Sequence, residues 1–222
     1  MQHSVSEMTG ANLRRRTRYA GVFLILLAAF CVIVVLNINI GSVPIPVSKI
    51  AKIIFAGEGD ARQVAIIWKI RLPRILMAAI LGGALSLSGF LLQNFFSNPI
   101  AGPFVLGISS GAKMVVALTM IFFLGKFGAV SSWTLVIAAF IGSLISVGFI
   151  LLLSRRLRHM AILLVGGIMI GYICSAVTDF VITFAEDADI VNLHGWSLGS
   201  FSGTSWEGVA VASVLIGMTS VL

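Results

Sequence analysis

Long apolar runs separated by short polar segments dominate the pattern of this chain. A helix needs about 20 apolar residues to cross a bilayer. Runs of that kind predict five complete transmembrane helices: Tyr19–Leu36, Ile75–Phe96, Phe104–Gly125, Trp133–Leu153 and Met160–Ala185. A sixth run, Val209–Leu222, is apolar but too short to cross. The pattern predicts an all-α integral membrane protein, a polytopic helical bundle with about five full helices and part of a sixth.

The first apolar run follows a basic segment that contains Arg14, Arg15, Arg16 and Arg18. A signal peptide would begin in the same way, but its apolar core is shorter and ends at a small-residue cleavage site, which does not follow here. We therefore interpret residues 1–18 as a basic N-terminal segment and residues 19–222 as one transmembrane domain, which would be incomplete because it stops within its sixth helix.

Composition agrees with this class and adds an orientation. Charged residues make up 10% of the 222 residues and hydrophobic residues 59%, whereas about a quarter of a soluble domain is charged. The net charge of +7 lies in short clusters beside the apolar runs, a pattern that favours membrane topology over nucleic-acid binding. The clusters Arg14–Arg18 and Arg155–Arg158 predict a cytoplasmic N-terminus. Cys31 and Cys174 fall inside predicted spans and indicate neither a disulfide nor a metal site.

The predicted outer loop, residues 41–74, is unexpectedly basic. Its segment Val47–Phe55 has the pattern of a short amphipathic helix on the membrane, with Ile50 facing lipid and Lys52 facing headgroups. Arg71 and Arg74 flank Pro73, which suits the first turn of a helix. Both arginines would then lie on one rim facing the outer aqueous side. Because a guanidinium pairs well with carboxylates, we interpret them as a docking point for an acidic partner.

The stretch RLPRILMAAILGGALSLSGFLLQNFFSNPIAGPFVLGISSGA, Arg71–Ala112, carries a resemblance to a known family. It closely resembles the second and third helices of ABC importer permeases of the FecCD and BtuC kind, which take up iron chelates and vitamin B12. The shared motifs are Arg71-Leu72-Pro73-Arg74, Gln93, Asn98-Pro99-Ile100-Ala101 and Gly107-Ile108-Ser109-Ser110-Gly111. The segment GWSLGSFSGTSW, Gly195–Trp206, is similar to the family's segment before helix six.

The resemblance implies a multi-pass permease subunit of the cytoplasmic (inner) membrane that imports a ferric siderophore or related iron chelate. Its implied partners are a second permease copy or paralogue, two cytoplasmic ATPase subunits and an extracytoplasmic binding protein whose glutamates meet Arg71 and Arg74. The permease itself would hydrolyse no ATP and carry no cofactor or metal. Family members have ten helices and grip the ATPase through a loop after helix six, and the sequence ends before that loop.

Two further sets of residues are candidates for function. Helix five lines the passage in the family, so the translocation route is expected to be bordered by Ser175, Thr178, Asp179, Trp196, Gly199 and Ser200. For Asp179, an interfacial carboxylate hydrated at the headgroups is an alternative. Small residues let helices approach closely, and the glycines expected to do so are Gly107, Gly111, Gly167 and Gly171.

Other functions fit the sequence less well. The segment Gly107–Met114 misses the spacing of a phosphate-binding loop. The segment Gly195–Gly199 matches the hydrolase G-x-S-x-G pattern, but that motif requires a strand–turn–helix elbow. We instead expect Gly195–Gly203 to form an irregular lip segment. An ion-coupled transporter would have paired, broken helices with carboxylates near the midplane, and Asp179, near the outer end of its span, is the one residue that offers anything of this kind. A haem or cobalamin importer of the same family remains the main alternative.

Overall fold

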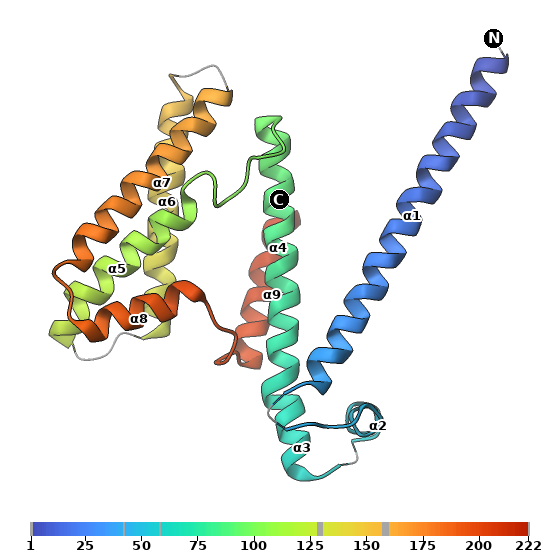
Figure 1. Ribbon diagram of the computed structural model, residues 1–222, viewed down its shortest axis with the longest axis horizontal. Coiled ribbons are helices and arrows are strands. Elements are labelled where there is room, and N and C mark those ends of the chain that lie inside the picture. Colours follow the sequence, from blue (N-terminus) through green and yellow to red (C-terminus); the bar gives the residue numbers. More distant parts are fainter. Residues whose placement is uncertain (1, 42, 58, 128–130, 157–159, 222) are drawn as a thin grey trace. The chain divides into compact units, whose positions relative to one another are not determined.

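The structure is a computed structural model that describes residues 2–41, 43–57, 59–127, 131–156 and 160–221. Arg158, one member of the second basic cluster, lies outside the described residues. The elements in chain order are α1 Gln2–Asn39, α2 Val47–Ala51, η1 Lys52–Ala56, α3 Ala61–Ile66, η2 Ile67–Arg71, α4 Leu72–Phe96, α5 Ile108–Phe127, α6 Ser132–Ser154, α7 Met160–Ile182, α8 Asp187–Leu198 and α9 Trp206–Val221 (Figure 1). The described chain is helical without strands, which confirms the all-α prediction.

Four described helical stretches are long and apolar enough to cross a membrane: 14–39, 61–96, 132–154 and 161–182. Two shorter apolar helices cover 108–122 and 206–220. The predicted third span was to begin at Phe104, but α5 begins at Ile108 because the preceding residues form turns that end at Gly107, whose φ is 71°. The number of complete spans therefore stays a prediction.

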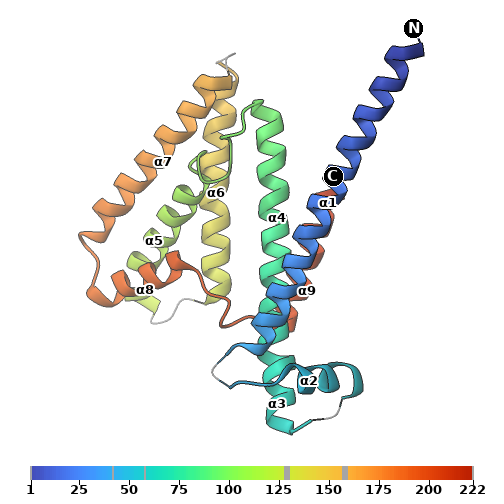
Figure 2. The ribbon, with the colours of Figure 1, turned by 45° about the vertical axis from the view of Figure 1, so that its right-hand side comes forward.

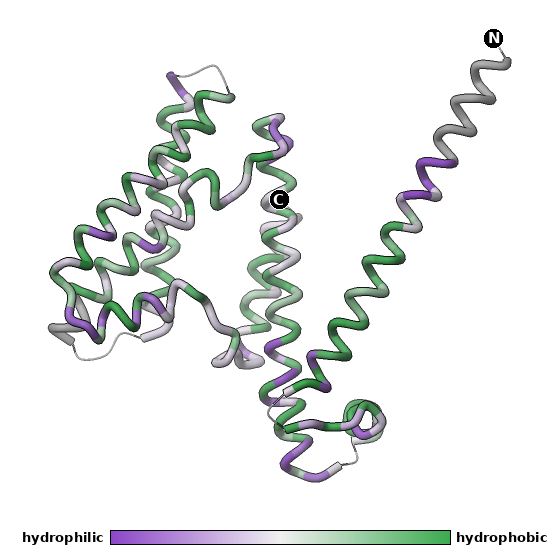
Figure 3. Tube along the Cα trace, viewed as in Figure 1, coloured by the Kyte–Doolittle hydropathy of each residue, from purple (hydrophilic) through white to green (hydrophobic). Residues whose placement is uncertain are grey.

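The long helix α1 shows how the basic and apolar segments are joined (Figure 3). Its arginines are exposed, and apolar side chains from Val22 to Leu36 are also largely exposed, as expected for a surface that meets lipid. Among the described residues, no break in the helix separates residues 2–18 from the predicted transmembrane domain, because α1 continues through this boundary.

Contacts divide the chain into two compact units, whose boundaries fall inside α4 and α9. Unit 1 comprises residues 1–79 and 202–215, and unit 2 comprises residues 80–201 and 216–222. Unit 1 holds α1, the segment from α2 to the start of α4, and the first part of α9. Its core consists of five isoleucines: Ile38, Ile45, Ile50, Ile53 and Ile67.

The core of unit 1 corrects one expectation about the outer loop. Ile50 is buried, and Ile54 packs against the same cluster, so this apolar face of α2 and η1 is covered by protein instead of lipid. Val47 remains about half exposed, as expected, and Lys49 and Lys52 are exposed. Sequence pattern could not separate the two cases because an apolar helix face looks the same whether lipid or protein covers it.

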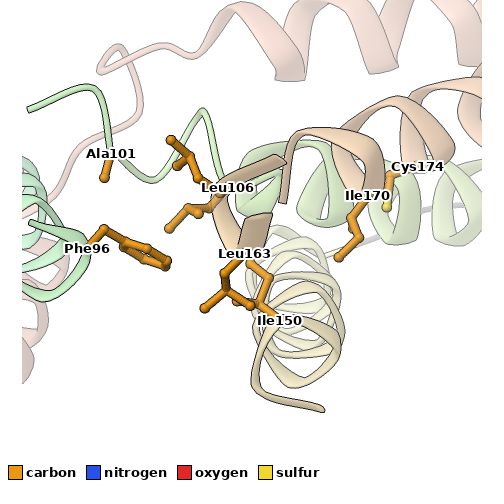
Figure 4. Close-up of a cluster of buried hydrophobic side chains, with 8 residues drawn as sticks. Phe96, Ala101, Leu106, Ile150, Leu163, Ile170 and Cys174 are labelled. Atoms are coloured by element: carbon orange, nitrogen blue, oxygen red, sulfur yellow. The ribbon is translucent and has the colours of Figure 1, made fainter. Parts of the chain in front are cut away.

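Unit 2 is built from α5, α6 and α7, which lie side by side (Figure 2). The segment after α4 crosses to this group, and its side chains Ala101 and Leu106 pack against Ile150 of α6 and Leu163 of α7 (Figure 4). A second cluster joins α5 and α6 to Leu193 of α8. Because Gly195–Leu198 belong to α8, the expectation that irregular structure begins at Gly195 was wrong, and the helix ends only at Gly199.

Candidate functional site

The two arginines expected at the rim lie at a local widening of the helix that leads into α4. The stretch η2 is π-helical, and Pro73 follows it in the first turn of α4. Arg71 ends η2 and is buried, with 8% of its surface exposed, whereas Arg74 one turn later is exposed. The expectation that both guanidinium groups face the aqueous side is therefore wrong for Arg71, and for the exposed Arg74 it stays a prediction.

The Arg71 guanidinium is held by backbone carbonyls at the end of α1. Its Nη1 donates to the carbonyl oxygen of Ile38 and, at 3.4 Å, to that of Asn39, while its Nη2 donates to the carbonyl oxygen of Val43. The last carbonyls of a helix lack intrahelical partners and carry partial negative charge, so they are favourable acceptors for a cation. This is the physical reason that Arg71 turns inward.

Gly41 makes room for this arrangement. A Cβ atom added to Gly41 would lie 2.7 Å from Nη2 of Arg71 and 3.2 Å from its Cζ. Side chains larger than hydrogen at position 41 would therefore displace the guanidinium from its carbonyls. The loop after α1 thus contributes the Val43 carbonyl and, at Gly41, the space that the cation needs.

Arg71 and Arg74 line the same pocket in unit 1, with a volume of about 340 Å³. The other lining residues are Asn37, Ile40, Gly41, Ile66, Ile70 and Ile75. The pocket therefore combines apolar walls with one exposed guanidinium and one buried guanidinium. Such a site is suited to a carboxylate-bearing side chain, because a guanidinium offers several donors in a planar array.

The residues expected along the translocation route do not come together in unit 2. Thr178 is buried and donates to the carbonyl oxygen of Cys174 at 2.8 Å, and Trp196 packs against the cluster around Leu193. Ser175 and Asp179, one helical turn apart, are exposed on another face of α7. Gly199 ends α8 with φ of 72°, and Ser200 is exposed beyond it.

Comparison with known proteins assigns the chain to a family. The profile of the FecCD transport family matches residues 10–222. The chain belongs to the FecCD transport family. It is also similar to the vitamin B12 import system permease protein BtuC of Klebsiella pneumoniae and of Salmonella paratyphi A, at 38% identity over 148 residues in each case. These alignments cover 67% of this chain and 44% of each relative, so the matched region is less than half of the relatives' length.

A solved structure supports the fold of this FecCD chain. It is described as an inward-facing conformation of a putative metal-chelate type ABC transporter. The similarity has a TM-score of 0.73 at 24% identity and covers 91% of this chain and 61% of the solved chain. At that identity the likeness concerns the fold.

The four glycines expected to pack helices of the FecCD chain lie at close backbone approaches. A Cβ atom on Gly107 would lie 2.7 Å from the backbone nitrogen of Gly171 and 2.8 Å from the carbonyl oxygen of Gly167. A Cβ atom on Gly111 would lie 2.7 Å from the carbonyl oxygen of Gly142. The first approach joins the start of α5 to α7, and the second joins α5 to α6.

Sequence reasoning missed Gly142 and Ser146, although a signal was present. Ala138, Gly142 and Ser146 recur every fourth residue on the buried face of α6, which is the small-residue spacing of closely packed membrane helices. The Ser146 hydroxyl is buried and has no hydrogen-bond partner among the described residues. A Cβ atom added to Gly111 would lie only 2.0 Å from the hydroxyl oxygen of Ser146.

The structure also bears on the chemical alternatives. Ser197 of the G-x-S-x-G match lies within α8 and donates to the carbonyl oxygen of His194 at 2.9 Å, so it is not on a strand–turn–helix elbow. Within the described residues, no group of three or more His, Cys, Asp or Glu side chains could hold a metal ion. Among the residues that the structure describes, the arginine-lined pocket of unit 1 is therefore the strongest candidate site.

Proposed function

We propose that the chain is a permease subunit of an ABC importer that carries a large metal chelate, a ferric siderophore or a related iron chelate. Membership of the FecCD family and the exposed guanidinium of Arg74 in an apolar pocket support this proposal. Cobalamin is the alternative cargo, and the likeness to vitamin B12 permeases favours it. Both cargoes are bulky metal complexes delivered by an extracytoplasmic binding protein.

Arg74 is the residue that we propose to meet the binding protein directly. The segment between α1 and α4 carries further exposed cations, and these are Lys49, Lys52, Arg62 and Lys69. A basic surface of this kind attracts an acidic partner and sets its orientation, while a close ion pair fixes the register. The adjoining isoleucines supply apolar contact around a glutamate that enters the pocket.

Two further features support an assembly instead of a lone chain. Asp179 is exposed in the last turn of α7, a helix long and apolar enough to cross the membrane, and ionisable side chains in such helices usually face protein or water instead of lipid. Ser175 shares its face. We infer that a second copy or paralogue, together with water in the transport passage, covers this face. Two ATPase subunits would supply the energy from the cytoplasm, where the arginines of α1 lie.

Charge reversal at Arg74 tests the docking role. We expect Arg74→Glu to abolish capture of the binding protein expressed from the same operon, measured with the permease in lipid nanodiscs. Arg62→Glu is the matched control, because Arg62 is an exposed cation of unit 1 that does not line the pocket. It should lower the association rate modestly and preserve the complex. Equal capture by the Arg74→Glu variant and the unmodified protein would refute the docking role.

Uptake by cells distinguishes the cargo. Cells lacking the permease gene are complemented with it and supplied with radiolabelled ferric siderophore or radiolabelled cobalamin. Uptake of the iron chelate alone would support the first proposal, and uptake of cobalamin alone would support the alternative. An absence of uptake of either compound, with all importer subunits present, would contradict both.

A further inference from the structure

The helix that carries the arginines contains a carbonyl group that its own backbone cannot satisfy. In η2 the N–H of Leu72 bonds to the carbonyl oxygen of Ile67, five residues back, and not to that of Trp68, four residues back. In the same register the carbonyl of Trp68 would pair with residue 73. That residue is Pro73, which has no N–H. The π-helical register and the proline therefore leave the Trp68 carbonyl oxygen without a backbone donor.

A residue from the far end of the chain supplies the missing donor. Nε1 of Trp206 donates to the carbonyl oxygen of Trp68 at 2.7 Å, across 138 residues of sequence. The two indole rings lie 6.2 Å apart between centroids, with an angle of 35° between their planes. Both tryptophans and their hydrogen bond belong to unit 1.

Trp206 is held in place by the start of its own helix. It is the first residue of α9, directly after Ser205. The Ser205 hydroxyl accepts from the backbone N–H of Gly208 at 3.2 Å, and its carbonyl accepts from Val209 at 3.1 Å. These bonds satisfy donors at the N-terminus of α9, in the manner of an N-cap. The indole is therefore presented from a capped helix end.

We propose that Trp206 is a positioning residue for the docking pocket, and this inference rests on the proposed docking function of Arg74. Its indole N–H satisfies the Trp68 carbonyl and thereby stabilises the π-helical register of η2. One residue corresponds to about 100° of rotation around an α-helix. Ile66 precedes η2, Ile70 lies within it and Arg74 follows it. The register of η2 therefore sets the directions of the two isoleucine side chains relative to that of Arg74.

The same register sets the direction of Arg71. With η2 in its π-helical form, the guanidinium reaches the carbonyls of Ile38 and Val43, and Arg74 remains exposed at the pocket. Trp206 acts through the backbone of η2, because its hydrogen bond goes to the Trp68 carbonyl. The start of α9 is thus joined to η2, whose last residue Arg71 lines the docking pocket, through the hydrogen bond between the two tryptophans.

A plain membrane-anchoring role for the two tryptophans makes a different prediction. Aromatic rings favour the membrane interface through their amphipathic character, and phenylalanine keeps most of that ring. The positioning role depends on the N–H group, which phenylalanine lacks. It also depends on Pro73, because an alanine at position 73 restores a backbone N–H that can serve the orphaned carbonyl.

The experiment uses the full-length gene product in lipid nanodiscs with two readouts. Amide hydrogen exchange of residues 67–72 reports the register of η2, and the affinity for the operon's binding protein reports the pocket. We expect Trp206→Phe to accelerate exchange and to weaken binding by about three- to tenfold, the size expected for one hydrogen bond. In a Pro73→Ala background the same change should alter binding by less than about twofold.

A matched control and the contrary outcomes make the test decisive. Trp133→Phe makes the same change at an exposed tryptophan of α6 and should alter neither readout. The positioning role is overturned if Arg74→Glu abolishes binding while Trp206→Phe leaves binding and exchange unchanged. It is also overturned if Trp206→Phe weakens binding equally with and without Pro73. If Arg74→Glu leaves binding intact, the docking function itself fails, whatever Trp206→Phe does to exchange.

Discussion

Arg71 and Arg74 are only three residues apart, but their side chains have different environments. Arg71 satisfies carbonyls at the end of α1 and is buried, while Arg74 is exposed in the pocket. Hydrogen bonds from a charged donor contribute more to stability than neutral ones, about 1.5–3 kcal/mol. We therefore expect Arg71 to contribute more than Arg74 to the free energy of unfolding, while the exposed side chain of Arg74 can bind a partner.

Lysine substitution separates the two tasks. We expect Arg71→Lys to lower the free energy of unfolding by about 1.5–3 kcal/mol, because one ammonium cannot reproduce the planar fork that reaches separate carbonyls. Arg74→Lys should leave thermal stability unchanged while it weakens capture of the binding protein. Thermal unfolding of both variants in detergent checks this, and equal melting temperatures for the two variants would contradict it.

At the scale of the element, the helices of unit 2 depend on glycines at their crossings. Gly111 of α5 and Gly142 of α6 face each other so closely that either Cβ would collide with backbone atoms of the other helix. Membrane helices gain little from the hydrophobic effect against one another, so close packing is a principal source of their association.

Alanine at two positions of α6 gives a paired test of this packing. A Cβ atom on Gly142 would lie 2.2 Å from the carbonyl oxygen of Gly111, whereas one on Gly148 would meet nothing within 4 Å. We expect Gly142→Ala to destabilise the protein by about 1–3 kcal/mol through overpacking. Gly148→Ala should be neutral or stabilising by up to about 1 kcal/mol, as helix propensity favours alanine. Thermal unfolding measures both, and similar losses of stability would contradict the assignment.

At the scale of the whole molecule, the proposed orientation places the basic N-terminus in the cytoplasm and unit 1's pocket outside. Exposed arginines at the start of α1 and at the end of α6, Arg155 and Arg156, agree with this orientation by the positive-inside rule. The proposed docking of an extracytoplasmic protein requires the same orientation.

Cysteine labelling in intact cells checks the orientation. We expect Ala61→Cys, at the exposed start of α3, to react with a membrane-impermeant maleimide from outside. Arg155→Cys is the control and should react only after permeabilisation. Both variants carry Cys31→Ser, because Cys31 is exposed. The reverse pattern would place Arg74 on the cytoplasmic side and exclude its proposed docking role.

Sequence was a good guide to helices and family but a poor guide to the partners of individual side chains. Apolar runs predicted the helices because a membrane span must be long and continuous. The burial of Arg71 was not predicted, because its acceptors lie 28 to 33 residues earlier and only the fold brings them together. The hydrogen bond between Trp206 and Trp68 was not predicted either, because 138 residues separate them.

The acceptors of Arg71 also give the chain an order of assembly. Ile38, Asn39 and Val43 all precede Arg71, so a growing polypeptide has already made them when the guanidinium leaves the ribosome. Synthesis runs from the N-terminus and early segments fold first. The contact between the end of α1 and η2 thus requires nothing that is translated later. The indole of Trp206, which bonds to the Trp68 carbonyl of η2, is made only after the intervening helices.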